Sequence, residues 1–559
     1  MSRASASRSA WAAVFIVATF LLSGSELEAQ TAPVAPAPAP ATGSALSGGE
    51  PAVEKAPDAP TEEQWLHAED GRAYRLEKLD KKTVQWQKVS PTRFRTAWGP
   101  IEVDREDEQY LYYRVYRDEG QPSKPSPDED RKQRAAEVRR LLPPPLAESD
   151  RLQGVDFGRG LPTTGQWRNG FEFADMNEDG KLDLVHGPAR KGDRRPKIFL
   201  GNGKGDWRNW TEASFPRQTY EYGDVSVGDF NGDHHLDLFF GAHLMGLQAL
   251  VGDGKGGFTS ADSGLPWRTL PSEPLGFSSQ QVQVVNWEGK TPEVLALSEG
   301  PKMSISAGAP AIEESSLGVR LYRNVSKDRK KVIWSWVNAD DKPTNLFGED
   351  LQLTPGRQSR GFLVGSGNMS AKNLLFTGRG PDGWLQEALP LPRQSYYWSL
   401  APLRRAGKAT FDVVGAGFST DAGLELQLID LYRRDASGWI RKTLWFAEQK
   451  AQGPIRVGTG DLDGNGLDDI VALGARGQVW ILLQEAGDAW TLESSPELQG
   501  PDGCLGGGLR VQDLDGDGRP EVAVSWAGEP DLLLDPKACP DEGSLRVWKL
   551  QARPATAKK

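Results

Sequence analysis

Apolar and polar residues alternate in many short stretches of this chain, and turns rich in Gly, Asp or Asn separate the stretches. In four segments a strand-like alternation, an acidic loop and a second apolar run follow one another. Since side chains along a strand point alternately to its two faces, this pattern predicts short β-strands joined by tight turns. The four segments are 171–187, 225–241, 456–474 and 509–528.

The segments recur at a regular spacing. The first loop Asp advances by 54 residues from Asp175 to Asp229 and by 52 residues from Asp461 to Asp513. The 232 residues between Asp229 and Asp461 leave room for about three weaker copies. Seven units of four short strands predict an all-β fold, a seven-bladed β-propeller. The weaker copies are expected at 284–298, 362–378 and 400–417, with 299–350 as either an insertion or part of another blade.

The first 150 residues do not follow this repeat. Residues 1–29 combine early Arg residues with an apolar run that is short for a bilayer span, which predicts a signal peptide, with an uncleaved membrane anchor as the alternative. Residues 30–60 are rich in Pro and Ala and predict an extended linker. Residues 61–150 predict a small β-rich region with a short helix, and residues 151–559 the propeller.

Two features stand out in the β-rich region at 61–150. In the run 110–116, Leu111, Tyr113 and Val115 are expected on one face of a strand. The helix is expected at 128–142, where acids come first and bases last, as the helix dipole favours.

The composition of the chain argues against several classes of partner and metal centre. The chain has 66 Lys and Arg against 77 Asp and Glu, a net charge of −11, which argues against a nucleic-acid partner. Five His and two Cys exclude cysteine-rich zinc arrays, iron–sulfur clusters and multihaem binding. Cys504 and Cys539 are expected to form a disulfide in an oxidising compartment, and two unpaired thiols are the alternative.

The four loops share the pattern D-x-[DN]-x-[DN]-x-x-x-[DE], whose positions 1, 3, 5 and 9 carry side-chain oxygens. Alternate oxygens on a tight loop converge on one point, and this number of hard oxygen donors suits Ca²⁺. An Asp/Gly-rich turn without metal is the alternative for any single loop. The predicted ligands are Asp175, Asn177, Asp179 and Asp183; Asp229, Asn231, Asp233 and Asp237; Asp461, Asp463, Asn465 and Asp469; and Asp513, Asp515, Asp517 and Glu521.

The loops differ at position 6, and they are not EF-hands. His234 replaces the Gly found at position 6 of the other three loops, where a positive φ is expected, so the second site is predicted to be the weakest. An EF-hand needs Glu at position 12 and flanking helices, whereas these loops carry His186, Phe240, Ala472 and Val524 there and are flanked by strand patterns.

The acidic hairpin loops followed by apolar strands resemble the FG-GAP/VCBS repeats of integrin-α-like β-propellers, in the form seen in secreted bacterial proteins. The sequence Phe240–Ala242 and the Gly-x-Gly turns at 201–203 and 252–254 fit the same template. The resemblance spans about 150–555. It implies a seven-bladed propeller with up to four Ca²⁺ ions in loops at one face, and a role in adhesion or recognition.

Three functions follow as alternatives. The first is an exported recognition module, periplasmic, at the cell surface or extracellular, whose ligand is a protein or polysaccharide and which is not an integral membrane protein after signal cleavage. The second is a structural component of an envelope assembly. The third is a polysaccharide lyase or hydrolase, but no G-x-S-x-G, H-E-x-x-H or P-loop motif is present, so no catalytic residue is predicted.

Overall fold

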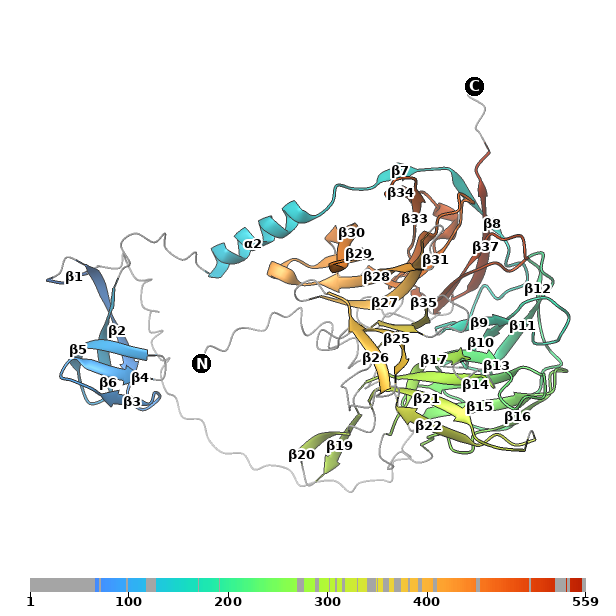
Figure 1. Cartoon of the computed structure of the whole chain (residues 1–559), viewed down its shortest axis with the longest axis horizontal. Coiled ribbons are helices and arrows are strands. Elements are labelled where there is room, and N and C mark those ends of the chain that lie inside the picture. Colours follow the sequence, from blue (N-terminus) through green and yellow to red (C-terminus); the bar gives the residue numbers. More distant parts are fainter. Residues whose placement is uncertain are drawn as a thin grey trace, which may run out of the picture. The chain divides into compact units, whose positions relative to one another are not determined.

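The computed structural model describes most of residues 66–554, and the longest stretches outside the description are 117–126, 339–347, 366–373 and 528–538. The predicted signal peptide at 1–29 and linker at 30–60 lie outside the described residues. The chain divides into two compact units, Met1–Ser123 and Lys124–Lys559, and each is described by itself (Figure 1).

The first unit contains a six-stranded sheet with the order β1-β2-β6-β5-β4-β3. Its small core consists of Phe94, Val103 and Leu111, with Tyr113 packed against them, as the alternation along 110–116 predicts. The strands are β1 (Leu66–His67), β2 (Ala73–Asp80), β3 (Trp86–Lys88), β4 (Arg93–Thr96), β5 (Gly99–Glu106) and β6 (Tyr110–Tyr116).

In its described residues the second unit consists mainly of seven antiparallel sheets that follow one another along the chain, here called sheets 1 to 7. Sheets 1 and 2 contain the two N-terminal repeats, at 171–187 and 225–241, and sheet 3 contains the expected copy at 284–298. Sheet 1 contains β9 (Phe171–Ala174), β10 (Asp183–His186), β11 (Lys197–Gly201) and β12 (Trp207–Asn209). Sheet 2 contains β13 (Val225–Gly228), β14 (Asp237–Ala242), β15 (Gly246–Gly252) and β16 (Phe258–Ser260). Sheet 3 contains β17 (Ser279–Val285), β18 (Glu293–Ser298), β21 (Val319–Asn324) and β22 (Trp334–Asn338).

The stretch 299–350 contains both an inserted hairpin and the last two strands of sheet 3. The hairpin β19 (Lys302–Ser306) and β20 (Ala309–Glu313) is inserted into sheet 3, and the strands β21 and β22 then complete that sheet. Sheets 4 and 5 follow and contain the expected copies at 362–378 and 400–417. Sheet 4 contains β23 (Asp350–Leu353), β24 (Phe362–Gly365), β25 (Leu374–Gly380) and β26 (Gly383–Ala388). Sheet 5 contains β27 (Ser395–Arg404), β28 (Phe411–Ser419), β29 (Leu426–Asp435) and β30 (Gly438–Glu448).

Sheets 6 and 7 carry the two C-terminal repeats. Sheet 6 contains β31 (Pro454–Gly460), β32 (Asp469–Gly474), β33 (Val479–Glu485) and β34 (Ala489–Glu493). Sheet 7 contains β35 (Leu505–Gln512), β36 (Glu521–Ala527) and β37 (Leu545–Ala552). Two 3-10 turns, η2 (Asp421–Gly423) and η3 (Pro496–Leu498), lie in the connections. Cys504 and Cys539, in the last sheet's connections, form a disulfide with Cα atoms 5.0 Å apart.

The first strands of neighbouring sheets contact one another in the order β9, β13, β17, β23, β27, β31 and β35. A shared apolar cluster then joins sheet 7 back to sheet 1, with Phe171 and Leu184 packed beside Leu514 and Val547. The sheets therefore form a closed, propeller-like arrangement, and the all-β prediction is confirmed. Among the described residues, no helix combines the length and apolar character that crossing a membrane requires.

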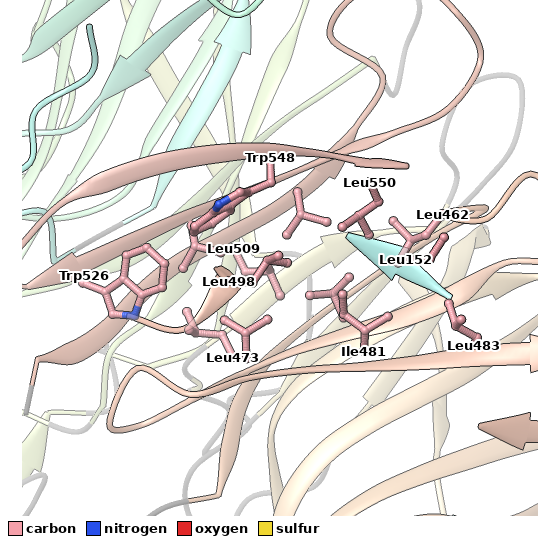
Figure 2. Packing of buried hydrophobic residues seen from close by; sticks show 14 of the residues in the cluster. Leu152, Leu462, Leu473, Ile481, Leu483, Leu498, Leu509, Trp526, Trp548 and Leu550 are labelled. Carbon is pink, nitrogen blue, oxygen red and sulfur yellow. The ribbon is translucent and has the colours of Figure 1, made fainter. Parts of the chain in front are cut away.

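A strand from before the repeats completes sheet 7. β8 (Leu152–Asp156) pairs antiparallel with β37, so that Asp156 lies opposite Trp548 (Figure 1). Figure 2 shows Leu152 of this strand among the buried Leu462, Ile481 and Leu550. Burying one Leu side chain stabilises the fold by about 2 kcal/mol, so this strand is part of the core rather than an appendage.

The expected boundary at residue 150 moves toward the N-terminus. The helix α2 (Pro127–Leu141) belongs to the second unit, because Ala135 packs on Leu424, Leu426 and Leu428. The strand β7 (Ala147–Ser149) pairs in parallel with β34 of sheet 6. The sequence pattern predicts the helix itself but not its contacts, and only these distant contacts assign it to the propeller-like unit.

Candidate functional site

The four acidic loops, numbered 1 to 4 in chain order, occupy equivalent places in sheets 1, 2, 6 and 7. Each connects the first strand of its sheet to the second: β9 to β10, β13 to β14, β31 to β32 and β35 to β36. All four connections are antiparallel hairpins, so each loop lies at the end of its sheet where the first strand finishes. The sequence predicted this placement from the strand patterns that flank each loop.

The carboxylate at position 9 is fully buried in every loop, at Asp183, Asp237, Asp469 and Glu521. In loop 3 one oxygen of Asp469 accepts the Leu462 N–H at 2.8 Å, and the other accepts the Gln484 N–H at 2.8 Å. Asp183 and Asp237 accept the corresponding pairs of N–H groups in sheets 1 and 2. In loops 1 to 3 this residue therefore ties the loop to the third strand of its sheet. In loop 4 Glu521 accepts the Leu514 N–H at 2.7 Å, and its other oxygen lies 3.4 Å from Lys549 on the third strand.

Burial changes the acidity of these buried carboxyl groups. It raises the pKa of Asp183 to about 6 and the pKa values of Asp237, Asp469 and Glu521 to about 7. Backbone N–H donors oppose the shift, and the other loop carboxylates add to it. A bound cation would favour the charged form of the same groups.

The position 1 carboxylate organises the loop backbone. In loop 3, Asp461 Oδ1 accepts the Gly464 N–H at 2.8 Å and Oδ2 accepts the Gly466 N–H at 2.9 Å. Asp513 does the same in loop 4 with Gly516 and Gly518. These bonds hold the chain in a tight curve, so that the alternate side chains are directed toward one another.

The backbone at position 6 has the conformation that the sequence predicted. Gly180, Gly466 and Gly518 have φ values of 78°, 84° and 89°, and His234 has 77°. A residue with a Cβ is strained in this region, whereas glycine is not. His235, next along the chain, lies with its Nδ1 2.5 Å from Glu178 Oε1, which links loop 2 to loop 1.

The structure brings three acidic groups together in two of the four loops. In the described residues, Asp461, Asp463 and Asp469 form one such group, and Asp513, Asp515 and Glu521 form the other. Within each group, one oxygen of each residue lies within 4.8 Å of the others. Each group can hold a metal ion.

Loops 1 and 2 differ because Asn occupies position 3. Asn177 Nδ2 donates to Asp179 Oδ2 at 3.2 Å, and Asn231 Nδ2 donates to Asp233 Oδ2 at 2.8 Å. The amide thus partly compensates the neighbouring carboxylate without a cation. In loop 3 the Asn is at position 5, and Asn465 Nδ2 donates instead to the Gln484 carbonyl at 2.8 Å.

Loop 4 has a neighbour that the sequence analysis did not identify. Lys549 on β37 pairs with Asp515, and its Nζ lies 2.6 Å from Asp517 and 3.4 Å from Glu521. These carboxylates raise the pKa of the ammonium group above its usual range, against the effect of burial. Lys549 is 28 residues beyond Glu521 in the sequence, and only the pairing of β36 with β37 brings it to the loop.

A family comparison agrees with the repeat. A family model described as FG-GAP-like repeat matches residues 187–240 and 461–524, which together contain the second, third and fourth loops. No curated protein matches the chain. A solved structure of BBS1N in complex with ARL6DN, soaked with lead, is similar to it with a TM-score of 0.40 and 11% identity over 72% of this chain and 98% of that chain.

Proposed function

We propose that this FG-GAP repeat protein is an exported, calcium-binding recognition module that binds a protein or a polysaccharide and has no catalytic activity of its own. FG-GAP repeats are typical of β-propeller modules that bind other molecules, and the sequence begins with a signal-like segment at 1–29. In this role the metal ions are structural: they hold the loops, and the surrounding surface makes the contacts.

The observation that carries the calcium proposal is the geometry of loop 3. Asp461, Asp463 and Asp469 offer three converging carboxylate oxygens. The loop also carries a neutral side-chain oxygen, Asn465 Oδ1, which accepts the Leu467 N–H at 2.7 Å. Three carboxylates this close repel one another strongly unless a cation lies among them. Ca²⁺ accepts six to eight oxygens in an irregular arrangement, whereas Mg²⁺ demands a near-ideal octahedron, so a loop of mixed donors favours Ca²⁺.

The test is a metal titration of the full mature chain after treatment with chelator. We expect Ca²⁺ to raise the melting temperature by several degrees, because binding to the native state alone adds about 4 kcal/mol at a thousandfold excess over Kd. Tb³⁺ luminescence, sensitised by nearby aromatic rings, reports the same sites. An unchanged melting curve between chelator and Ca²⁺ at low ionic strength contradicts the proposal.

Two variants of loop 3 separate binding from folding. Asp463→Asn should weaken Ca²⁺ binding and leave the stability in chelator nearly unchanged, because the amide oxygen can still accept the Asn465 N–H that Asp463 Oδ1 accepts at 3.1 Å. Asp469→Ala should lower the stability in chelator as well, by about 2–4 kcal/mol, because it leaves the Leu462 and Gln484 N–H groups buried without partners. Asp328→Asn, in an exposed turn, is the matched control.

A further inference from the structure

A cavity of about 450 Å³ lies on sheet 1 at the end opposite to its acidic loop. β10 begins at Asp183 in the loop and ends at His186, and His186 lines the cavity together with Trp167, Asp193 and Lys197. The size is in the range of pockets that take a small ligand or one unit of a polymer. None of these residues belongs to the acidic loops, so the cavity is a separate feature of the unit.

Trp167 gives the cavity a fixed apolar wall. Its indole Nε1 donates to the Thr164 carbonyl at 2.9 Å, so the N–H group is already satisfied. The ring forms T-shaped pairs with His186 and Phe199, with ring centroids 5.1 Å and 5.8 Å apart. His186 is in turn held by a hydrogen bond of 2.7 Å between its Nδ1 and the Gly187 carbonyl. These contacts fix the orientation of the indole, which offers an apolar surface to the cavity.

The rim of the cavity is basic, although the chain as a whole is acidic. The cavity is lined by one base, Lys197, and one acid, Asp193, and Arg195 beside them adds a second positive charge, whereas Arg194 is paired with Glu221. The one acid, Asp193, pairs with Arg195 at 2.9 Å and with Lys197, and these partners hold its pKa far below the usual range. Arg190 lies 5.7 Å from the centre of the Tyr222 ring on the neighbouring side. The rim therefore favours an anionic ligand.

One of the three glycines that line the cavity leaves its side open. Gly165, Gly187 and Gly192 line it. An added Cβ at Gly192 would meet nothing within 4 Å, so this side of the cavity is open space. A flat wall, an open glycine side and a basic rim match a sugar ring that carries a carboxylate: its C–H face packs on the indole, and its carboxylate meets the cations.

We propose that this cavity binds a uronate residue of an acidic polysaccharide, with the pyranose ring on Trp167 and the carboxylate at Lys197. The inference rests on the proposed recognition function and names its ligand class. A single carboxylate per sugar fits a small basic rim on an acidic protein, whereas a nucleic acid, with a phosphate at every step, would be repelled by the rest of the surface.

The test compares two ligands that differ only in charge. Short oligogalacturonates and their methyl esters are titrated into the full mature chain by calorimetry at one fixed Ca²⁺ concentration. We expect the acid form to bind and the ester to bind about tenfold more weakly, as the loss of one charge-assisted contact implies. Equal binding of acid and ester overturns the proposal, and so does binding of inorganic phosphate in place of either sugar.

Variants assign the contacts. Lys197→Gln should weaken the acid form about tenfold and leave the ester unchanged, and Trp167→Leu should weaken both. Lys204→Gln is the matched control, because this exposed lysine lies in the turn after β11, near the loop end of sheet 1. A Lys197→Gln variant that binds the acid form as tightly as the unaltered chain contradicts the assignment.

A measurement of metal binding distinguishes failure of the cavity proposal from failure of the calcium proposal. Each variant is first titrated with Tb³⁺, since the acidic loops lie at the other end of the sheet and should be unaffected. Loss of sugar binding with normal Tb³⁺ binding tests the cavity alone. Absence of sugar binding in an unaltered chain that binds Ca²⁺ normally overturns the inference and leaves the calcium proposal standing, whereas failure of Ca²⁺ binding alone leaves the cavity proposal standing.

Discussion

The ammonium nitrogen of Lys549 lies 2.6 Å from Asp517 Oδ2 and 3.4 Å from Glu521 Oε1, and it also pairs with Asp515. Loop 4 therefore contains a positive charge supplied by its own sheet. Among the described residues no lysine pairs with loop 3. Arg151 lies 3.6 Å from Asp463 and closer to Glu485, whereas Arg404 pairs with Asp468 and Arg519 donates to the Leu462 carbonyl. Without a metal ion, a lysine therefore balances part of the negative charge of the loop 4 carboxylates, whereas no described lysine does so in loop 3.

Replacement of Lys549 by Met should change how loop 4 responds to calcium. Without the ammonium group the carboxylates lack a counter-charge, so we expect the free energy of unfolding in chelator to fall by about 2 kcal/mol. The same change should strengthen Ca²⁺ binding at this loop, because the metal no longer competes with Lys549. Urea unfolding in chelator and Tb³⁺ titration measure the two effects.

The control for this variant is Lys442→Met, which removes a lysine of β30 that lies outside the acidic loops and donates to the Asp488 carbonyl at 3.3 Å. It should alter neither the stability in chelator nor the metal titration. Ca²⁺ binding that stays the same or becomes weaker in Lys549→Met would show that the lysine does not compete with the ion.

His234→Gly should stabilise the protein. His234 has a φ of 77°, a region that disfavours residues with a Cβ, whereas its three counterparts are glycines. The release of this strain exceeds the added entropy of glycine in the unfolded chain, and we expect a gain of about 0.5–1 kcal/mol. Thermal unfolding with and without Ca²⁺ measures it.

His235→Gly is the informative comparison for that variant. It places a glycine one position further along and removes the contact between His235 and Glu178, so it should destabilise the protein. If both substitutions lower the melting temperature, the positive φ at His234 carries no strain that glycine can relieve.

Asp224 should make stability depend on pH. It is 3% exposed, and its Oδ1 has no hydrogen-bond partner among the described residues. Burial raises its pKa to about 7, with Arg510 opposing the shift and Glu172 adding to it. Between pH 4 and pH 7 the folded state therefore keeps a proton that the unfolded state releases, so this group costs stability as the pH rises and its cost is constant above pH 7.

Asp224→Asn removes this titration. Relative to the unaltered chain, the variant should gain about 2 kcal/mol between pH 5 and pH 8, as measured by urea unfolding at both pH values. Subtraction of the two proteins cancels the titration of the loop carboxylates, and Asp328→Asn provides the control. A difference between the two proteins that is the same at pH 5 and pH 8 would disprove the assignment.

Leu152→Ala should destabilise the propeller-like unit by about 3 kcal/mol, because Leu152 of β8 is 3% exposed in the apolar cluster of sheets 6 and 7. Leu141→Ala, at the end of α2, is matched in chemistry but involves a residue that is 81% exposed, and it should have little effect. Chemical denaturation of both variants tests the comparison. Similar losses in the two would mean that β8 does not contribute to the core.

The sequence predicted those features that depend on neighbouring residues. The alternation of apolar residues predicts the strands around each loop, and the position of Gly180, Gly466 and Gly518 predicts a positive φ that His234 shares. The features it missed depend on residues far apart in the chain. Lys549 reaches loop 4 only through strand pairing, and α2 is assigned to the second unit only by its packing on Leu424 and Leu426.

The pairing of β8 with β37 sets an order of events for the growing chain. Asp156 and its partner Trp548 are 392 positions apart, so β8 has no partner strand until nearly the whole polypeptide has been made. Contacts of such long range form late and slowly. Until then β8, with the apolar side chain of Leu152, is open to other chains, a state prone to aggregation. Production of this protein therefore depends on protecting an incomplete ring for the duration of its own synthesis, and truncation of even its final strand should yield insoluble material.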